Sequence, residues 1–127
     1  MSSSKRIALA SAVAAVLAAS SVALGAGGPL GTYKSTIKSP AQIKGTWSVS
    51  FKKNGVYAVS LNGRSLARGT WSATATTITL REPNGCGGTG TYSWKKSGRV
   101  LRFTRKSEAA GCEIRAAVLR HPFAQVG

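Results

Sequence analysis

Side chains that perform acid–base or metal chemistry are nearly missing from this 127-residue sequence. It has no aspartate, one histidine (His121) and three acids, Glu82, Glu108 and Glu113. Hydrolysis by paired carboxylates, oxygen-ligand metal sites and serine–histidine–aspartate catalysis all depend on acids or histidines, of which this chain has hardly any. We expect each glutamate to form a local salt bridge and His121 to be solvated near the chain end. The sequence therefore predicts no enzyme, no catalytic residue, no metal site and no cofactor.

The two cysteines, Cys86 and Cys112, are the other reactive side chains. With one distant histidine they are too few for a structural zinc site, and no Cys-x-x-Cys redox motif is present. In an oxidising compartment an even pair of cysteines predicts a disulfide. A bond between Cys86 and Cys112 would stabilise the fold by about 3.5 kcal/mol on the chain-entropy model.

Basic side chains are abundant: 18 lysines and arginines against three acids give a net charge of +15. Such a charge attracts polyanions with a strong dependence on salt. Outside a cell these are anionic cell-wall polymers, membrane surfaces or nucleic acid, and no motif for sequence-specific nucleic-acid binding is present. The alternative is a surface that is merely well solvated. The predicted polyanion-binding residues are Lys95, Lys96, Arg99, Arg102, Arg105 and Lys106.

The elements that position these side chains follow from the apolar periodicity. After residue 31, apolar and polar residues alternate in short runs, as in half-buried strands. Turn signals separate the runs, the strongest being Asn62-Gly63, where both residues tolerate a positive φ. One strand is expected over 112–120, with a helix over Ala109–Leu119 as the alternative. The pattern predicts an all-β fold, a small antiparallel up-and-down β-barrel of about eight strands, because closure removes exposed edges.

The first thirty residues have a different composition. Lys5 and Arg6 precede 18 apolar or small residues, Ile7–Leu24, which is the pattern of a secretory signal peptide. An uncleaved membrane anchor is the alternative, because this length just suffices to span a bilayer. We expect residues 1–25 to be removed and the protein to be secreted, with no membrane-spanning segment left. The mature chain would have a flexible tail over 26–30, a barrel over 31–121 and a C-terminal tail over 122–127.

Aromatic residues share the inward parity of the predicted strands. As a cavity lining they would hold a small apolar ligand, whereas as a filled core they would only stabilise the barrel. Both interpretations stay open at this point. The candidate ligand-binding residues are Trp47, Tyr57, Trp71, Tyr92, Trp94 and Phe103.

A Gly-Thr-aromatic tripeptide is repeated along the chain. Glycine permits a bend or bulge where a strand begins, threonine takes the outer face, and the aromatic ring fills the interior. The four copies are Gly31-Thr32-Tyr33, Gly45-Thr46-Trp47, Gly69-Thr70-Trp71 and Gly90-Thr91-Tyr92.

The copy at Gly45 resembles the Gly-x-Trp signature of the calycins, the lipocalins and avidins. Avidins also repeat such tripeptides at later strand starts. In lipocalins an arginine near the chain end lies over the signature tryptophan, so the resemblance implies a structural role for Gly45 and places Arg115 over Trp47. Such cation–π stacking contributes about 0.5–2 kcal/mol.

The chain is also similar to small secreted lipocalin-like proteins of actinobacteria, which share a Cys…Gly-x-Tyr-x-Trp…Cys-x-x-Arg order. It departs from ordinary lipocalins in being shorter, in lacking their Thr-Asp-Tyr motif, and in having no predicted C-terminal packing helix. The residues that match the shared order are Cys86, Gly90, Tyr92, Trp94, Cys112 and Arg115.

These observations lead to one functional expectation and two alternatives. The resemblance implies a secreted, non-enzymatic binding protein whose barrel holds a small apolar ligand. The basic surface favours instead a protein that binds a cell-envelope polymer or another polyanion. The third interpretation is a protease inhibitor, because avidin-like barrels of this size include bacterial metalloprotease inhibitors.

Overall fold

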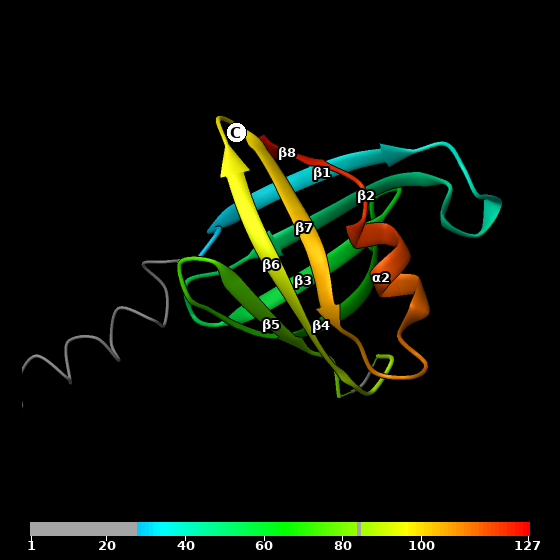
Figure 1. The fold of residues 1–127 in the computed structure, drawn as a ribbon. Coiled ribbons are helices and arrows are strands. Elements are labelled where there is room, and N and C mark those ends of the chain that lie inside the picture. Colours follow the sequence, from blue (N-terminus) through cyan, green and yellow to red (C-terminus); the bar gives the residue numbers. More distant parts are fainter. Residues whose placement is uncertain (1–27, 84) are drawn as a thin grey trace, which may run out of the picture.

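A closed barrel forms the body of the molecule in the computed structural model, which describes residues 28–83 and 85–127 (Figure 1). The predicted signal peptide, residues 1–25, lies outside the described residues. Two short helices accompany the strands, η1 (Ala41–Ile43) after β1 and α2 (Glu113–Leu119) before β8; neither is long and apolar enough to cross a membrane. The eight strands are β1 (Gly31–Ile37), β2 (Gly45–Phe51), β3 (Val56–Leu61), β4 (Arg64–Ala73), β5 (Thr77–Arg81), β6 (Thr89–Ser97), β7 (Val100–Ser107) and β8 (Phe123–Val126).

Each strand pairs antiparallel with the next in sequence, and β8 returns to pair with β1. The predicted fold class, an up-and-down antiparallel barrel of about eight strands with one disulfide, is therefore confirmed. Asn62 and Gly63 join β3 to β4 with φ values of 51° and 83°, as a tight hairpin turn requires. Thr74 makes the β4–β5 turn, because its hydroxyl accepts hydrogen bonds from the N–H groups of Thr76 and Thr77.

Strand β4 is ten residues long and contains an irregularity in its pairing with β3. Ser65 pairs with Ser60 and Ala67 with Val59, so Leu66 is an extra residue with no partner on β3. Such a β-bulge bends the strand and re-aims its side chains. The bulge leaves the Leu66 side chain 56% exposed.

The prediction of a strand over 112–120 is wrong. This segment forms α2, the helical alternative, which buries Ala116, Val118 and Leu119 on one face. The barrel is closed instead by Phe123–Val126, within the segment predicted to be a C-terminal tail. An alanine-rich segment without β-branched alternation favours a helix once a single apolar face can be buried. The expectation of no C-terminal packing helix fails for the same reason.

Aromatic rings fill the middle of the barrel. Phe51 is their centre: its ring lies 5.6 Å from Trp71, 6.2 Å from Tyr57 and 6.2 Å from Phe103, measured between ring centroids. At these separations the rings are in edge or tilted contact. The centre of the barrel is thus a packed core, and any binding space must lie toward one of its ends.

Candidate functional site

An apolar pocket of about 220 Å³ lies between α2, the inward faces of β2–β5 and the loops around the disulfide. Seven lining residues come from strands, four from α2 and five from loops. They are Trp47, Val49, Tyr57, Val59, Leu66, Ala67, Leu80, Glu82, Gly85, Cys86, Gly111, Cys112, Ile114, Arg115, Val118 and Leu119.

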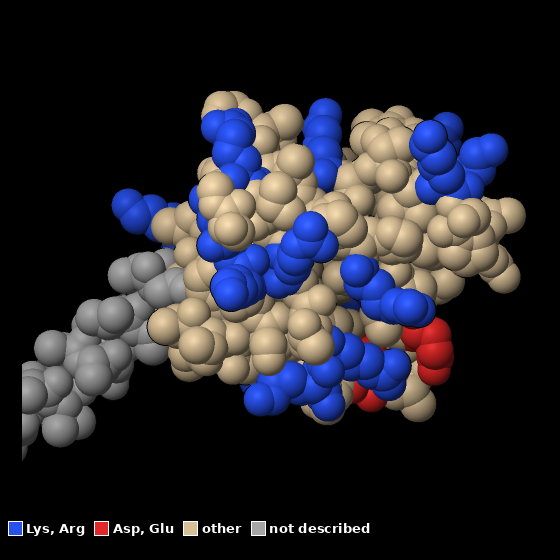
Figure 2. All heavy atoms as spheres, turned by 45° about the horizontal axis from the view of Figure 1, so that its top comes forward, with Lys and Arg blue, Asp and Glu red and all other residues tan. Residues whose placement is uncertain are grey.

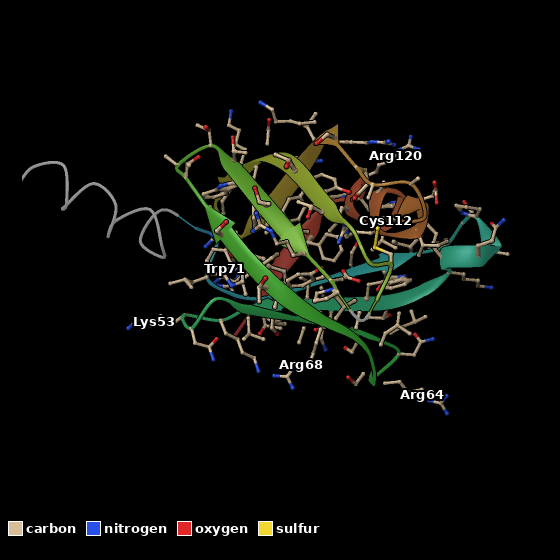
Figure 3. The ribbon with its side chains drawn as sticks, turned by 90° about the horizontal axis from the view of Figure 1, so that it is seen from below. Lys53, Arg64, Arg68, Trp71, Cys112 and Arg120 are labelled. Atoms are coloured by element: carbon tan, nitrogen blue, oxygen red, sulfur yellow. A yellow bond between two sulfur atoms is a disulfide. The ribbon has the colours of Figure 1, made fainter. Side chains whose placement is uncertain are left out.

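The Cys86–Cys112 disulfide holds one wall of this pocket in place. Its Cα atoms are 5.2 Å apart, which confirms the predicted pairing. Cys112 is the N-cap residue of α2, and Cys86 lies in the loop between β5 and β6. Figure 3 shows the disulfide beside α2, at a distance from Trp71, which lies toward the other end of the barrel. The bond therefore ties the helix over the barrel mouth.

Arg115 holds the same wall through a buried ionic network. Its Nε donates to Glu108 Oε2 at 2.8 Å while Nη2 binds Glu108 Oε1, and Nη2 also donates to the carbonyl of Gly88 at 3.2 Å. Its Nη1 lies 3.4 Å from Glu82 Oε2 and 3.4 Å from the Tyr57 hydroxyl. The Arg115, Glu82 and Glu108 side chains are 7%, 9% and 1% exposed, so the network is shielded from water.

Two tyrosines complete this network. The Tyr57 hydroxyl donates to Glu82 and the Tyr92 hydroxyl donates to Glu108. Burial, followed by the adjacent carboxylate, raises the pKa of both phenols well above the ordinary value. Burial acts to raise the pKa of Glu108 as well, but hydrogen bonds from Arg115, Tyr92 and the Ala109 N–H outweigh it and leave that pKa lowered.

Close packing explains one of the repeated glycines. An ideal Cβ placed on Gly90 would lie 2.5 Å from a Glu108 carboxylate oxygen. The carboxylate can approach β6 only because this position has no side chain. Gly45, predicted to be structural, begins β2 at a φ of 138°, which side-chain-bearing residues rarely adopt.

The predicted ligand-binding residues divide between the pocket and the core. Trp47 and Tyr57 line the pocket, whereas Trp71, Tyr92, Trp94 and Phe103 do not. Phe103 lines a second, shallower hollow on the β7 side of α2. The three indole N–H groups are all used, donating to backbone carbonyls of Ile43, Lys52 and Thr74.

The predicted stacking of Arg115 over Trp47 is replaced by ion pairing. Both residues line the pocket, but within the part of the chain that the structure describes the cation–π contact is formed by Lys96 and Tyr33. Buried carboxylates attract a guanidinium more strongly than an aromatic ring does. The helix places Arg115 between Glu82 and Glu108, whereas the predicted strand would have aimed it differently.

The sequence predicted roles for Arg115, Trp47, Tyr57 and the disulfide, but not their mutual contacts. The glutamates were expected to form local salt bridges, whereas Glu82 and Glu108 share one arginine. Because acids are so rare in this basic chain, their presence could have indicated that the glutamates have a structural role. Leu66 and Ile114, which are 56% and 51% exposed at the pocket, depend on the bulge and the helix, and no sequence pattern indicated them.

The predicted polyanion-binding residues are all exposed and lie on β6, β7 and the turn between them, but two of them make other contacts. Lys95 and Arg102 lie opposite each other on β6 and β7. Arg99 instead binds the carbonyls of Gln125 and Gly127, and Lys96 lies 5.8 Å from the ring centre of Tyr33. Figure 2 shows basic groups spread over one face and acidic side chains gathered near one end.

Among residues 28–83 and 85–127 no group of three histidine, cysteine or acidic side chains is arranged to hold a metal ion. Comparisons of the chain with protein-family models, curated proteins and solved structures find no match. The eight-stranded antiparallel barrel is compatible with a calycin-like fold. The site must therefore be interpreted from its own chemistry.

Proposed function

We propose that the chain is a secreted, non-enzymatic binding protein of lipocalin-like type whose barrel mouth holds a small apolar ligand. The observation that carries this proposal is the apolar pocket under α2. Concave apolar sites with a few polar groups are the usual form of small-molecule sites. The disulfide is compatible with an oxidising compartment, which supports the export that the N-terminal pattern predicts.

The rim of the pocket supports the proposal further. Leu66 on the β4 bulge and Ile114 on α2 are large apolar side chains that solvent reaches, and both line the pocket. Apolar side chains grouped at the mouth of a cavity are typical of ligand entrances. A ligand that covers them gains the free energy of removing this surface from water.

The pocket volume limits the ligand to a small molecule. A cavity of about 150 Å³ lined by apolar residues holds benzene in another protein. A volume of about 220 Å³ accordingly suits one aromatic ring with a short substituent, or an aliphatic chain of similar bulk. Long fatty acids and retinoid-sized molecules would not fit without movement of α2.

The test introduces a large side chain into the pocket and compares its effect on ligand binding with that of the same substitution outside the pocket. Ala67 lines the pocket on β4, whereas Ala58 on β3 has the opposite parity to Tyr57 and Val59 and does not line it. We expect Ala67→Phe to weaken the binding of 2-phenylethanol at least about ten-fold, and Ala58→Phe to leave it unchanged. Protein-detected NMR titration measures both, and equal affinity in the two variants would refute the proposal.

A second candidate function is polyanion binding, and one observation favours it. Among the residues that the structure describes, the salt bridges use Arg115, and the other lysines and arginines have no acidic partner within reach. Lys95 and Arg102 even face each other across two strands, where like charges repel. The negative charge of an anionic polymer would relieve this repulsion, and the release of the polymer's counterions would favour binding.

A further inference from the structure

We propose that the pocket selects apolar amines over apolar carboxylates, although the protein as a whole is strongly basic. The inference rests on the proposed function and names the class of ligand that its pocket takes. The net charge of +15 would by itself favour anions. The charges that line the pocket have the opposite balance.

Polar groups reach the pocket on one side only, where Tyr57, Glu82 and Arg115 contribute to its lining. Two carboxylates, Glu82 and Glu108, share the single guanidinium of Arg115. This cluster therefore has a net charge of −1. The Glu82 side chain is 9% exposed, and it is the one acid that lines the pocket.

The hydrogen-bond donors of this cluster are already engaged. The Tyr57 hydroxyl donates to Glu82, and Arg115 donates to Glu108, the Gly88 carbonyl and the Tyr57 oxygen. Acceptor capacity remains, because Glu82 Oε1 receives no hydrogen bond from the residues that the structure describes. A ligand can consequently satisfy this side of the pocket by donating, and an acceptor-only group such as a carboxylate cannot.

Gly85 borders Glu82 Oε1. An ideal Cβ on Gly85 would lie 2.4 Å from Glu82 Oε1, so any larger residue would crowd this atom. Gly85 and Glu82 both line the pocket, so the Glu82 side chain belongs to its wall. The rest of the lining, from Trp47 to Leu119, is suited to an apolar body.

Solvent screening explains why the surface charge does not reverse this preference. Outside the Arg115 cluster the described lysines and arginines are exposed, and water and salt weaken the interactions of exposed charges. A charge at the Glu82 oxygen is in direct contact and in a low-dielectric surrounding, where Coulomb interactions are several times stronger than in water. A bound carboxylate would meet Glu82 as a like charge, whereas a bound ammonium would form a charge-assisted hydrogen bond.

The test compares 2-phenylethylamine, 2-phenylethanol and phenylacetate, which share the ring and nearly the same length. Dissociation constants are measured by NMR titration at pH 7 in physiological salt, where the amine is protonated and the acid ionised. We expect the amine to bind about ten-fold or more tightly than phenylacetate, with the alcohol between them. This ranking needs no variant and so does not depend on the folding of one.

Glu82→Gln then removes the charge and keeps the shape. We expect it to weaken amine binding about ten-fold, to the level of the alcohol, while alcohol affinity stays within about two-fold. Glu113→Gln is the control, because it removes the same charge from an exposed residue of α2 that does not line the pocket. Circular dichroism and thermal unfolding show whether each variant is folded.

The outcomes separate the two proposals. If none of the three probes binds, the apolar-ligand function itself is wrong, and the inference falls with it. If the probes bind with equal affinity, or phenylacetate binds most tightly, the ligand-binding function stands and the amine preference is refuted. Equal loss of amine affinity in Glu82→Gln and Glu113→Gln would also refute it, because general charge would then decide binding.

Discussion

Arg115 is the residue on which the mouth of the barrel depends. It connects α2 to Glu108 just before the helix and to the distant Glu82 after β5, so three segments meet at one guanidinium. Arginine suits this position because its planar group binds one carboxylate bidentately and still reaches other acceptors. Removing one partner of a buried ion pair leaves the others charged and uncompensated.

We expect Arg115→Met to lower the free energy of unfolding by about 3–5 kcal/mol, because two buried carboxylates lose their counter-charge. Urea-induced unfolding followed by tryptophan fluorescence measures the change. Arg120→Met, one residue beyond α2 and exposed, is the matched control and should change stability by less than about 0.5 kcal/mol. A loss below about 1 kcal/mol in Arg115→Met would contradict the structural role.

The tyrosines predict a loss of stability in alkaline solution. All three tyrosines of the chain, Tyr33, Tyr57 and Tyr92, have raised pKa values in the folded state, with burial as the leading cause. Above about pH 10 the unfolded chain releases its phenolic protons while the folded chain keeps them. Unfolding therefore becomes more favourable by up to about 1.4 kcal/mol per pH unit for each tyrosine.

Phenolate absorbance checks this prediction directly. We expect little ionisation in the folded protein near pH 10–11 and a cooperative rise that coincides with loss of the circular dichroism signal. Non-cooperative titration near pH 10 in the folded protein would contradict it.

In acid solution the lowered pKa of Glu108 affects stability in the opposite sense. Its contribution to the free energy of unfolding is present above about pH 4.3 and is lost as the pH falls further.

At the scale of elements, α2 decides where the pocket is. It contributes Ile114, Arg115, Val118 and Leu119 to the lining, and the disulfide and the Arg115 network hold its first turn. A helix of seven residues has no stability of its own in water, so these tethers and its buried face maintain it. The Leu66 bulge supplies the facing rim.

Replacing both cysteines, Cys86→Ser with Cys112→Ser, should lower stability by about 2–4 kcal/mol and weaken probe binding as α2 loosens. Thermal unfolding and an NMR titration with 2-phenylethanol report the two effects separately. Wild-type protein in reducing agent should behave like the double variant. If stability falls but binding is unchanged, the disulfide does not position the pocket wall.

At the scale of the whole molecule, charge is distributed unevenly. The three glutamates lie in loops and in the first turn of α2. On the face drawn in Figure 2, lysines and arginines are spread widely, whereas the acidic side chains gather near one end. Arg64 and Arg68 on β4, for example, extend away from the barrel (Figure 3). Polyanion binding would consequently use faces away from the acidic end.

For the polyanion candidate we expect the mature protein to be retained on heparin above physiological salt, with steeply salt-dependent elution. Lys95→Glu with Arg102→Glu should lower the eluting salt concentration, because it reverses two adjacent charges. Lys52→Glu with Lys53→Glu is the control of equal charge change on another hairpin. An equal decrease of the eluting salt concentration in both double variants would indicate that total charge alone governs retention. Elution of the unsubstituted protein below physiological salt would refute polyanion binding.

How much of the molecule was predictable differs between elements and contacts. The alternation of Trp47 with Ser48 and Val49, and the Asn62-Gly63 turn, are local patterns, so the early strands and hairpins of the barrel followed from them, whereas β8 did not. The disulfide followed from cysteine count and expected compartment. The segment 112–120 failed because its periodicity was ambiguous, and burial against the barrel end decided between strand and helix.

The sequence by itself determined the all-β barrel, the pairing of the cysteines and the excess of basic charge, because these depend on residue periodicity and counts. Only the tertiary structure decided that Phe51 and its neighbours fill the centre, that β8 closes the barrel, and that a pocket lies under α2. It also brought Glu82 and Glu108, 26 residues apart, to one arginine. The physical reason is that ion pairing, burial and cavity shape depend on distances between segments that no local pattern encodes.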